Sequence, residues 1–152
     1  MQFLNNYSNR ELNIWAELIL DILVSFYFFP KIFPLIIDGQ LYSDALVGII
    51  ATSIIISIIY SIFVFGAINT LTKREEKDER DYVYELKSYR ISNIISQVSI
   101  YLLISLIVFN PINQVRLNEF TAPMIAMLLL IITLLSSTGK SLTQLFNYRK
   151  NI

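Results

Sequence analysis

The chain has 152 residues, of which 55% are apolar and only 16% are charged. An average soluble protein is about 45–50% apolar and about 25% charged, so this composition favours a membrane protein. Twelve basic and twelve acidic residues cancel, and no net positive field is left to attract nucleic acid. The chain contains no cysteine and no histidine, which excludes disulfides, thiol nucleophiles, imidazole bases and the usual zinc ligand sets. We therefore expect neither a metal nor a cofactor.

Four long apolar segments dominate the sequence, and about 20 apolar residues in a helix are enough to cross the ~30 Å hydrocarbon core of a bilayer. They are residues 14–37, 45–71, 91–109 and 121–138. The first contains Glu17 and Asp21, which disfavours a cleaved signal peptide. The third stops before Pro111 and the fourth is predicted to end at Gly139, because proline and glycine commonly follow helix ends. We predict an all-α polytopic membrane protein, a four-helix bundle forming one membrane domain over residues 1–152.

The distribution of basic residues predicts the orientation, because cytoplasmic flanks of membrane helices retain an excess of Lys and Arg. Ten basic residues fall on one side of the four segments: Arg10, Lys73, Arg74, Lys77, Arg80, Lys87, Arg90, Lys140, Arg149 and Lys150. Only Lys31 and Arg116 fall on the other side. Both termini and the polar loop 72–90 are therefore predicted to be cytoplasmic, with residues 38–44 and 110–120 outside.

The loop 72–90 holds six acidic and six basic residues, so it is not a polybasic patch for anionic lipids. No glycine or proline lies between Gly66 and Pro111, which predicts that the third helix begins near Asp78 and projects into the cytoplasm. One interpretation is a solvated, salt-bridged helix start. The other is a cytoplasmic surface that docks a partner, built from Asp78, Arg80, Asp81, Glu85, Lys87 and Arg90, or less favourably a cation site built from the three carboxylates among them. Carboxylates at helical spacing alone are a weak metal signal, because hard cations also need loop carbonyls.

The run from Lys77 to Asp81, followed by residues 85–91 leading into a span, resembles a group of uncharacterised small bacterial membrane proteins. Those proteins carry an Asp-Glu-Arg-Asp element, then a lysine and an arginine, between their second and third spans. The resemblance covers about residues 76–92 and is only architectural elsewhere. It implies a multi-pass protein of the bacterial inner membrane, and it supplies no catalytic residues.

Polar residues also recur every four positions inside two predicted spans, and so share one helix face in each. In the first span these are Asn13, Glu17, Asp21 and Ser25, and in the third they are Asn93, Gln97, Tyr101 and Ser105. An ionised residue at the centre of a span costs at least about 2.5–3.5 kcal/mol, so Glu17 and Asp21 should face other helices or water. Arg10 or water could satisfy Glu17, whereas no basic residue in the other predicted spans can pair with Asp21. We interpret Glu17, Asp21, Gln97 and Tyr101 as an intramembrane polar cluster, which either holds the helices in register or binds a ligand.

Three functional classes follow from these features. The first is a non-enzymatic membrane module whose charged helix docks a cytoplasmic or membrane protein, or a second copy of the chain. The second is a small proton- or cation-coupled carrier that uses Asp21 and Glu17. An enzyme is the least favoured, because the sequence contains no nucleophile-base set, zinc-protease motif or phosphate-binding loop.

Overall fold

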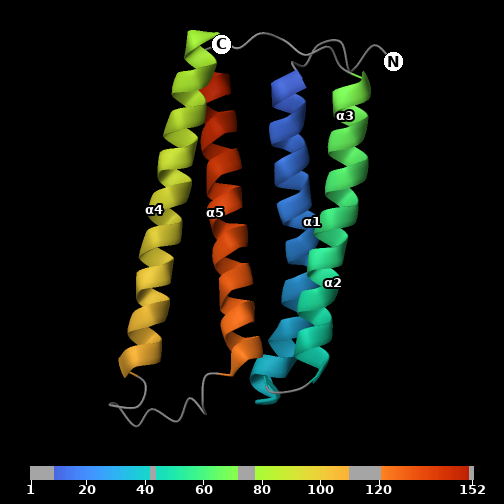
Figure 1. Cartoon of the computed structure of the whole chain (residues 1–152), viewed down its shortest axis with the longest axis vertical. Helices are drawn as coiled ribbons and strands as arrows, with labels where there is room; N and C mark the ends of the chain where they lie inside the picture. The colour runs from blue at the N-terminus through green and yellow to red at the C-terminus, as the bar shows by residue number, and fades with distance from the viewer. Residues whose placement is uncertain (1–8, 42–43, 72–77, 110–120, 151–152) are drawn as a thin grey trace.

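The computed structural model describes residues 9–41, 44–71, 78–109 and 121–150, and these residues are almost entirely helical (Figure 1). The elements are α1 (Asn9–Ile37), α2 (Asp44–Tyr60), the π-helical turn η2 (Ser61–Phe65), α3 (Gly66–Leu71), α4 (Glu79–Phe109) and α5 (Ala122–Lys150). The segments α2, η2 and α3 follow one another without a break and form one long rod. Four helices are thus long and apolar enough to cross a membrane, as the sequence predicted. The predicted loop residues 72–77 and the predicted outer segment 110–120 lie outside the described residues.

Helix α1 continues through Pro30 and Pro34 and ends at Ile37, two residues before Gly39. Gly39 has a positive φ of 66°, a conformation that glycine adopts without strain. The Gln40 amide donates to the Leu35 carbonyl oxygen at 2.9 Å, and the Gly39 amide donates to Ile36 at 3.3 Å. This pair of bonds is the Schellman motif, which satisfies carbonyls left free at a helix end.

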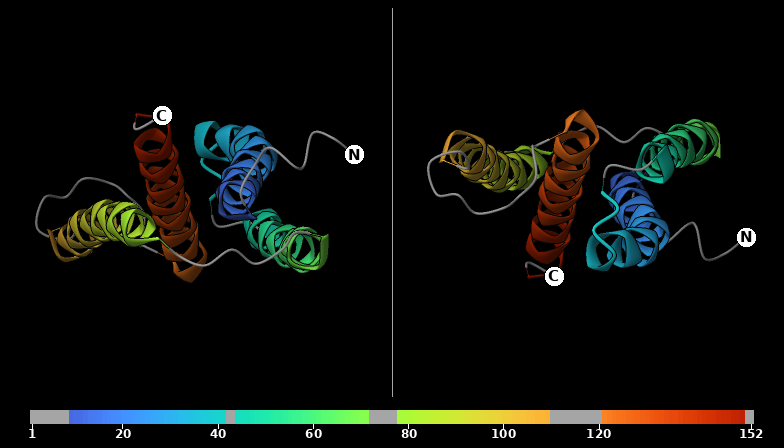
Figure 2. Two further views of the ribbon diagram at one scale, coloured as in Figure 1. Left: turned by 90° about the horizontal axis from the view of Figure 1, so that it is seen from above. Right: turned by 90° about the horizontal axis from the view of Figure 1, so that it is seen from below.

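Seen from above and below, the helices lie in the order α4, α5, α1, α2, with α5 between α4 and α1 (Figure 2). The largest buried apolar cluster joins α1, α2 and α5 and contains Phe28, Ile32, Leu46, Ile50 and Met127. Helix α4 packs along α5 alone among the described helices, and only Ser88 and Leu103 of its residues are buried. Most of the surface of α4 is therefore uncovered.

Small side chains allow α4 and α5 to lie close together. The Ser136 hydroxyl on α5 lies 2.6 Å from the Ser92 hydroxyl and 2.8 Å from that of Ser96, both on α4. One turn along α5, a Cβ atom built on Gly139 would lie 2.6 Å from Cδ1 of Ile95. Small residues and interhelical hydroxyl bonds of this kind are typical of helix contacts in membranes.

The predicted end of the fourth helix at Gly139 is wrong, because α5 continues to Lys150. Gly139 lies inside the helix, where its missing side chain leaves room for Ile95 instead of providing a helix end. The longer helix also changes which charged residues can form ion pairs. It places Lys140 on the same rigid helix as the apolar residues before it, facing the acidic residues of α1.

Candidate functional site

A polar cluster lies at the end of the molecule where α1 and α4 begin and α5 ends (Figure 1). Its first part is an ion pair between Lys140 on α5 and Glu17 on α1. The Lys140 amine donates to both carboxylate oxygens of Glu17, at 2.8 and 3.1 Å, and the Ser141 hydroxyl lies 3.4 Å from one of them. Lys140 also lies 5.1 Å from the centre of the Tyr89 ring on α4. The side chains of Lys140 and Glu17 are only 19% and 31% exposed, so the pair is partly shielded from solvent.

The second part of the cluster joins the starts of α1 and α4 to the end of α5. Arg10 on α1 forms an ion pair with Asp81 on α4. The Tyr148 hydroxyl on α5 donates to the other oxygen of Asp81 at 2.6 Å, and the Tyr148 ring packs edge-on against Tyr84. One carboxylate therefore holds three helices together.

Asp81 and Tyr148 lie beyond the predicted spans, and their protonation states follow from these contacts. Burial raises the pKa of Asp81, but hydrogen bonds from Tyr148, the Asp78 amide and Arg10 outweigh it, so the pKa lies below its usual value. Burial, with the bond to Asp81, raises the pKa of Tyr148 to about 12. At neutral pH Asp81 is thus an ionised acceptor and Tyr148 a neutral donor.

Asp81 also fixes the start of α4. Its carboxylate accepts the Asp78 amide hydrogen at 3.0 Å, while the Asp78 carboxylate accepts the Glu79 amide hydrogen at 2.6 Å. Asp81 is the third residue of the helix, and Asp78 is the residue before it. A hydrogen bond from the Asp78 amide to the Asp81 carboxylate is the bond that a capping box makes, and it satisfies an amide left free at a helix start. Asp78 and Asp81 of the predicted docking set therefore make contacts within the protein.

A cavity of about 150 Å³ lies between these contacts, and it is lined by Arg10, Asn13, Ile14, Glu17, Glu85, Tyr89, Lys140, Gln144 and Tyr148. Basic and acidic groups face it from α1, α4 and α5. Within the described parts of the chain, no group of three or more acidic residues comes close enough to hold a metal ion.

The structure divides the predicted intramembrane cluster into two places. Asp21 is buried next to α5, where the Thr138 hydroxyl donates to its carboxylate at 3.3 Å. Gln97 and Tyr101 are exposed on α4, and Tyr101 is 70% exposed. Serine residues, not Gln97 and Tyr101, occupy the face of α4 that meets α5. Glu17 and Asp21 thus share one site with α5, and Gln97 and Tyr101 face away from it.

The exposed side of α4 has an unusual distribution of polarity. Seven residues along this side, spaced alternately three and four positions apart, form a stripe that we call the α4 seam. They are Val83, Leu86, Arg90, Asn93, Gln97, Ile100 and Ile104. All seven are exposed. Its apolar members Val83 and Leu86, 48% and 73% exposed, lie in the segment predicted to project into water. Its amides Asn93 and Gln97, flanked by Tyr101, lie in the segment predicted to cross the membrane.

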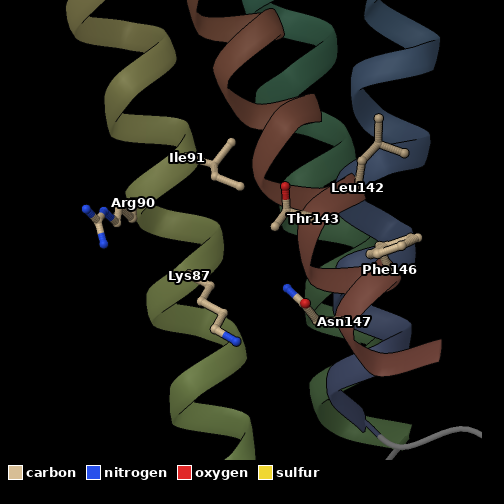
Figure 3. Close-up of a pocket in the computed structure, with 7 residues that line it drawn as sticks. All are labelled: Lys87, Arg90, Ile91, Leu142, Thr143, Phe146 and Asn147. Carbon is tan, nitrogen blue, oxygen red and sulfur yellow. The ribbon is translucent and has the colours of Figure 1, made fainter. Parts of the chain in front are cut away.

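The basic members of the predicted docking set, Arg80, Lys87 and Arg90, are exposed, whereas Glu85 is half-buried. Lys87 and Arg90 line a groove of about 670 Å³ between α4 and α5, together with Ile91, Leu142, Thr143, Phe146 and Asn147 (Figure 3). In this view Lys87 extends toward α5, whereas Arg90 points away from it. The predicted set is therefore split, because Asp81 makes contacts within the protein whereas the three basic residues are exposed.

Sequence reasoning missed Lys140, Tyr148 and Thr138, the partners of the acidic residues. A signal was present, because Lys140, Gln144 and Tyr148 recur every four residues as a continued helix would place them. This periodicity was missed because Gly139 was interpreted as the end of the helix.

The partly buried polar cluster and the exposed α4 seam are thus the two candidate sites of this chain. Comparison with protein-family models, with curated proteins and with solved structures gives no match to the chain.

Proposed function

We propose that the chain is a multi-pass protein of the bacterial inner membrane with both termini in the cytoplasm, and that it is a non-enzymatic docking module. Its four long helices form a membrane bundle. The α4 seam docks another transmembrane helix, and the polar cluster at the cytoplasmic end holds α4 in place for that contact. The proposed compartment rests on the resemblance around residues 76–92 and on the distribution of basic residues.

The observation that carries the docking function is a pair of exposed amides, Asn93 and Gln97, in the membrane part of the α4 seam. The same part continues with the apolar Ile100 and Ile104, as lipid requires. The cytoplasmic part in turn exposes the apolar Val83 and Leu86 beside Arg90. An amide in hydrocarbon without a hydrogen-bond partner costs several kcal/mol on alkane scales. A partner helix against the seam removes this cost and also covers Val83 and Leu86.

The polar cluster supports the same function. Arg10, Asp81 and Tyr148 join the start of α4 to α1 and α5. Such cross-links between helix ends set the rotation of α4 about its own axis. A fixed rotation is what a docking helix needs, because its partner must meet the same face each time.

A proton- or cation-coupled carrier has less support from the geometry. That hypothesis used Gln97 and Tyr101 as partners of Asp21, but both lie on the other side of α4. Glu17 is paired with Lys140, so the two charges offset each other. The docking module accounts for Gln97 and Tyr101 and for the ion pairs together.

The orientation gives the first testable prediction. Reporter domains fused after Lys77 and at the C-terminus should be active only as cytoplasmic reporters, and one fused after Gln114 only as an external reporter. The reason is the excess of Lys and Arg on the proposed cytoplasmic side. An external C-terminus would contradict the four-span topology.

The second prediction tests docking in the membrane. A photo-crosslinking amino acid at position 101 should form adducts with a protein when membranes are irradiated, because Tyr101 flanks the α4 seam. The matched control is Ile58 on α2, which is 53% exposed against 70% for Tyr101 but has only apolar exposed neighbours. Position 58 should react with lipid alone. Only lipid adducts at both positions would refute the docking function.

A further inference from the structure

We propose that the helix docked on the α4 seam is α4 of a second copy of this chain, in a parallel dimer with a two-fold axis along the membrane normal. This inference rests on the proposed docking function and names its partner. In the dimer Gln97 of one copy meets Gln97 of the other.

Symmetry supplies the first step. All copies of the chain insert with the same orientation, so a two-fold pair in the membrane has its axis perpendicular to the bilayer. In an interface of that symmetry, each residue on the axis meets its own counterpart at the same depth. A second copy therefore matches amide to amide and apolar residue to apolar residue at every seam position except Arg90, which would meet its own counterpart.

Hydrogen-bond chemistry supplies the second step. The Gln97 side chain has an NH₂ donor and a carbonyl acceptor, so two copies can bond to each other reciprocally. Asn93 has the same groups one helical turn nearer the cytoplasm, and the Tyr101 hydroxyl can both donate and accept. No charge is needed, because each of these side chains can form a hydrogen bond with the same side chain of the second copy.

The spacing of the seam supplies the third step. Alternate steps of three and four residues over Val83, Leu86, Arg90, Asn93, Gln97, Ile100 and Ile104 are the heptad pattern of a parallel two-helix coiled coil. A polar residue at a single position of such a seam can fix the register and the number of strands, and here Arg90, Asn93 and Gln97 are polar at three successive positions. All seven positions are left uncovered by α5, as are others on α4 such as Val98 and Leu102.

Two features of α4 bear on the fit of a second copy. Among the described helices α4 packs against α5 only, so none of them covers the seam. Arg90 is the one charged member of the seam, and its side chain points to the side of α4 opposite α5, where the second copy would lie (Figure 3). Arg90 lies where the apolar span begins, so the guanidinium can extend to the lipid headgroups instead of facing its counterpart.

Disulfide formation between single cysteines tests the dimer, since the natural chain contains no cysteine. Gln97→Cys and Ile104→Cys lie on the seam, and Ile104→Cys keeps Gln97. Val98→Cys and Leu102→Cys lie on exposed positions beside it, 53% and 61% exposed. After oxidation in native membranes, positions 97 and 104 should form covalent dimers at least about tenfold faster than positions 98 and 102, because only facing sulfurs can reach bonding distance.

Two controls make the result interpretable. The double variant Ser92→Cys/Ser136→Cys should form a disulfide within one chain, because the hydroxyl groups it replaces lie 2.6 Å apart. Adding Gln97→Leu to Ile104→Cys should slow dimer formation several-fold, whereas adding Ser105→Leu, also exposed but off the seam, should not. Two differently tagged copies should both be found in the cross-linked band.

These measurements distinguish a failure of the dimer from a failure of the docking function. Equal rates at positions 97, 98, 102 and 104, or none, would overturn the second copy as the partner. If photo-crosslinking at position 101 then still yields protein adducts, the docking function survives with a different transmembrane helix. If it yields lipid alone, both proposals are refuted.

Discussion

Replacing Lys140 with methionine is expected to lower the free energy of unfolding by about 2 kcal/mol, because it leaves Glu17 partly buried without its cation. Removing one member of a fully buried ion pair can cost about 3–5 kcal/mol. The smaller value is expected here because the Glu17 side chain is 31% exposed and keeps part of its contact with solvent. Thermal unfolding in detergent measures the effect, and Trp15, the single tryptophan, reports on this end of the molecule because it lies 5.5 Å from Arg149.

Two variants control for general effects of the Lys140 substitution. Lys150→Met removes an exposed charge from the end of the same helix and should leave stability nearly unchanged. Adding Glu17→Gln to Lys140→Met should restore part of the loss, because the unpaired carboxylate is then gone. Equal stability of the Lys140 and Lys150 variants would show that the ion pair contributes nothing.

Replacing Gly139 with isoleucine is expected to cost about 2–3 kcal/mol, since overfilling a packed contact forces neighbouring groups to move. A Cβ atom at this position already comes within 2.6 Å of Ile95, and the longer branches of isoleucine would separate α5 from α4. The loss should appear as weaker thermal stability. It should also appear as slower disulfide formation in the Ser92→Cys/Ser136→Cys background, which reports directly on the distance between α4 and α5.

The matched control for this prediction is Gly48→Ile on α2. Gly48 also lies inside a helix, but a Cβ atom built there has no neighbour within 4 Å. Both substitutions therefore introduce isoleucine at a glycine inside a helix, and they differ in the packing around it. Gly139→Ala combined with Ile95→Val should be close to natural stability, because valine lacks the Cδ1 atom that the added methyl group would meet. If Gly139→Ile is no worse than Gly48→Ile, α4 and α5 do not depend on this close approach.

The sequence predicted the helices well where local chemistry decides them. The second helix, predicted at 45–71, is observed from Asp44 to Leu71, and the third begins at Glu79, one residue after the predicted start. Apolar length was sufficient for the second helix, and the run without glycine or proline indicated the start of the third. The fourth helix was predicted too short because a glycine within a helix and one after it look alike in sequence. Only the contact with Ile95 distinguishes them.

The candidate sites were predicted less completely, and the reason is physical. Arg10 or water was expected to satisfy Glu17, but Arg10 pairs with Asp81 and Glu17 with Lys140. Each pairing joins residues more than 70 positions apart in the chain. Sequence periodicity shows which residues share a face of one helix, and it contains no information on which face of another helix they meet.

The sequence by itself thus determined the number of helices, their approximate limits and the polar residues they carry, because these depend on local composition and helix geometry. Only the tertiary structure decided how each helix is rotated about its axis, which placed Asp21 beside Thr138 and left Gln97 exposed. In a soluble protein the apolar face of a helix reveals that rotation, since it must turn away from water. A helix that is apolar on every side gives no such indication, because lipid is as apolar as the protein interior. Its rotation is then decided by close packing and a few polar contacts, such as those of Ser136 with Ser92 and Ser96.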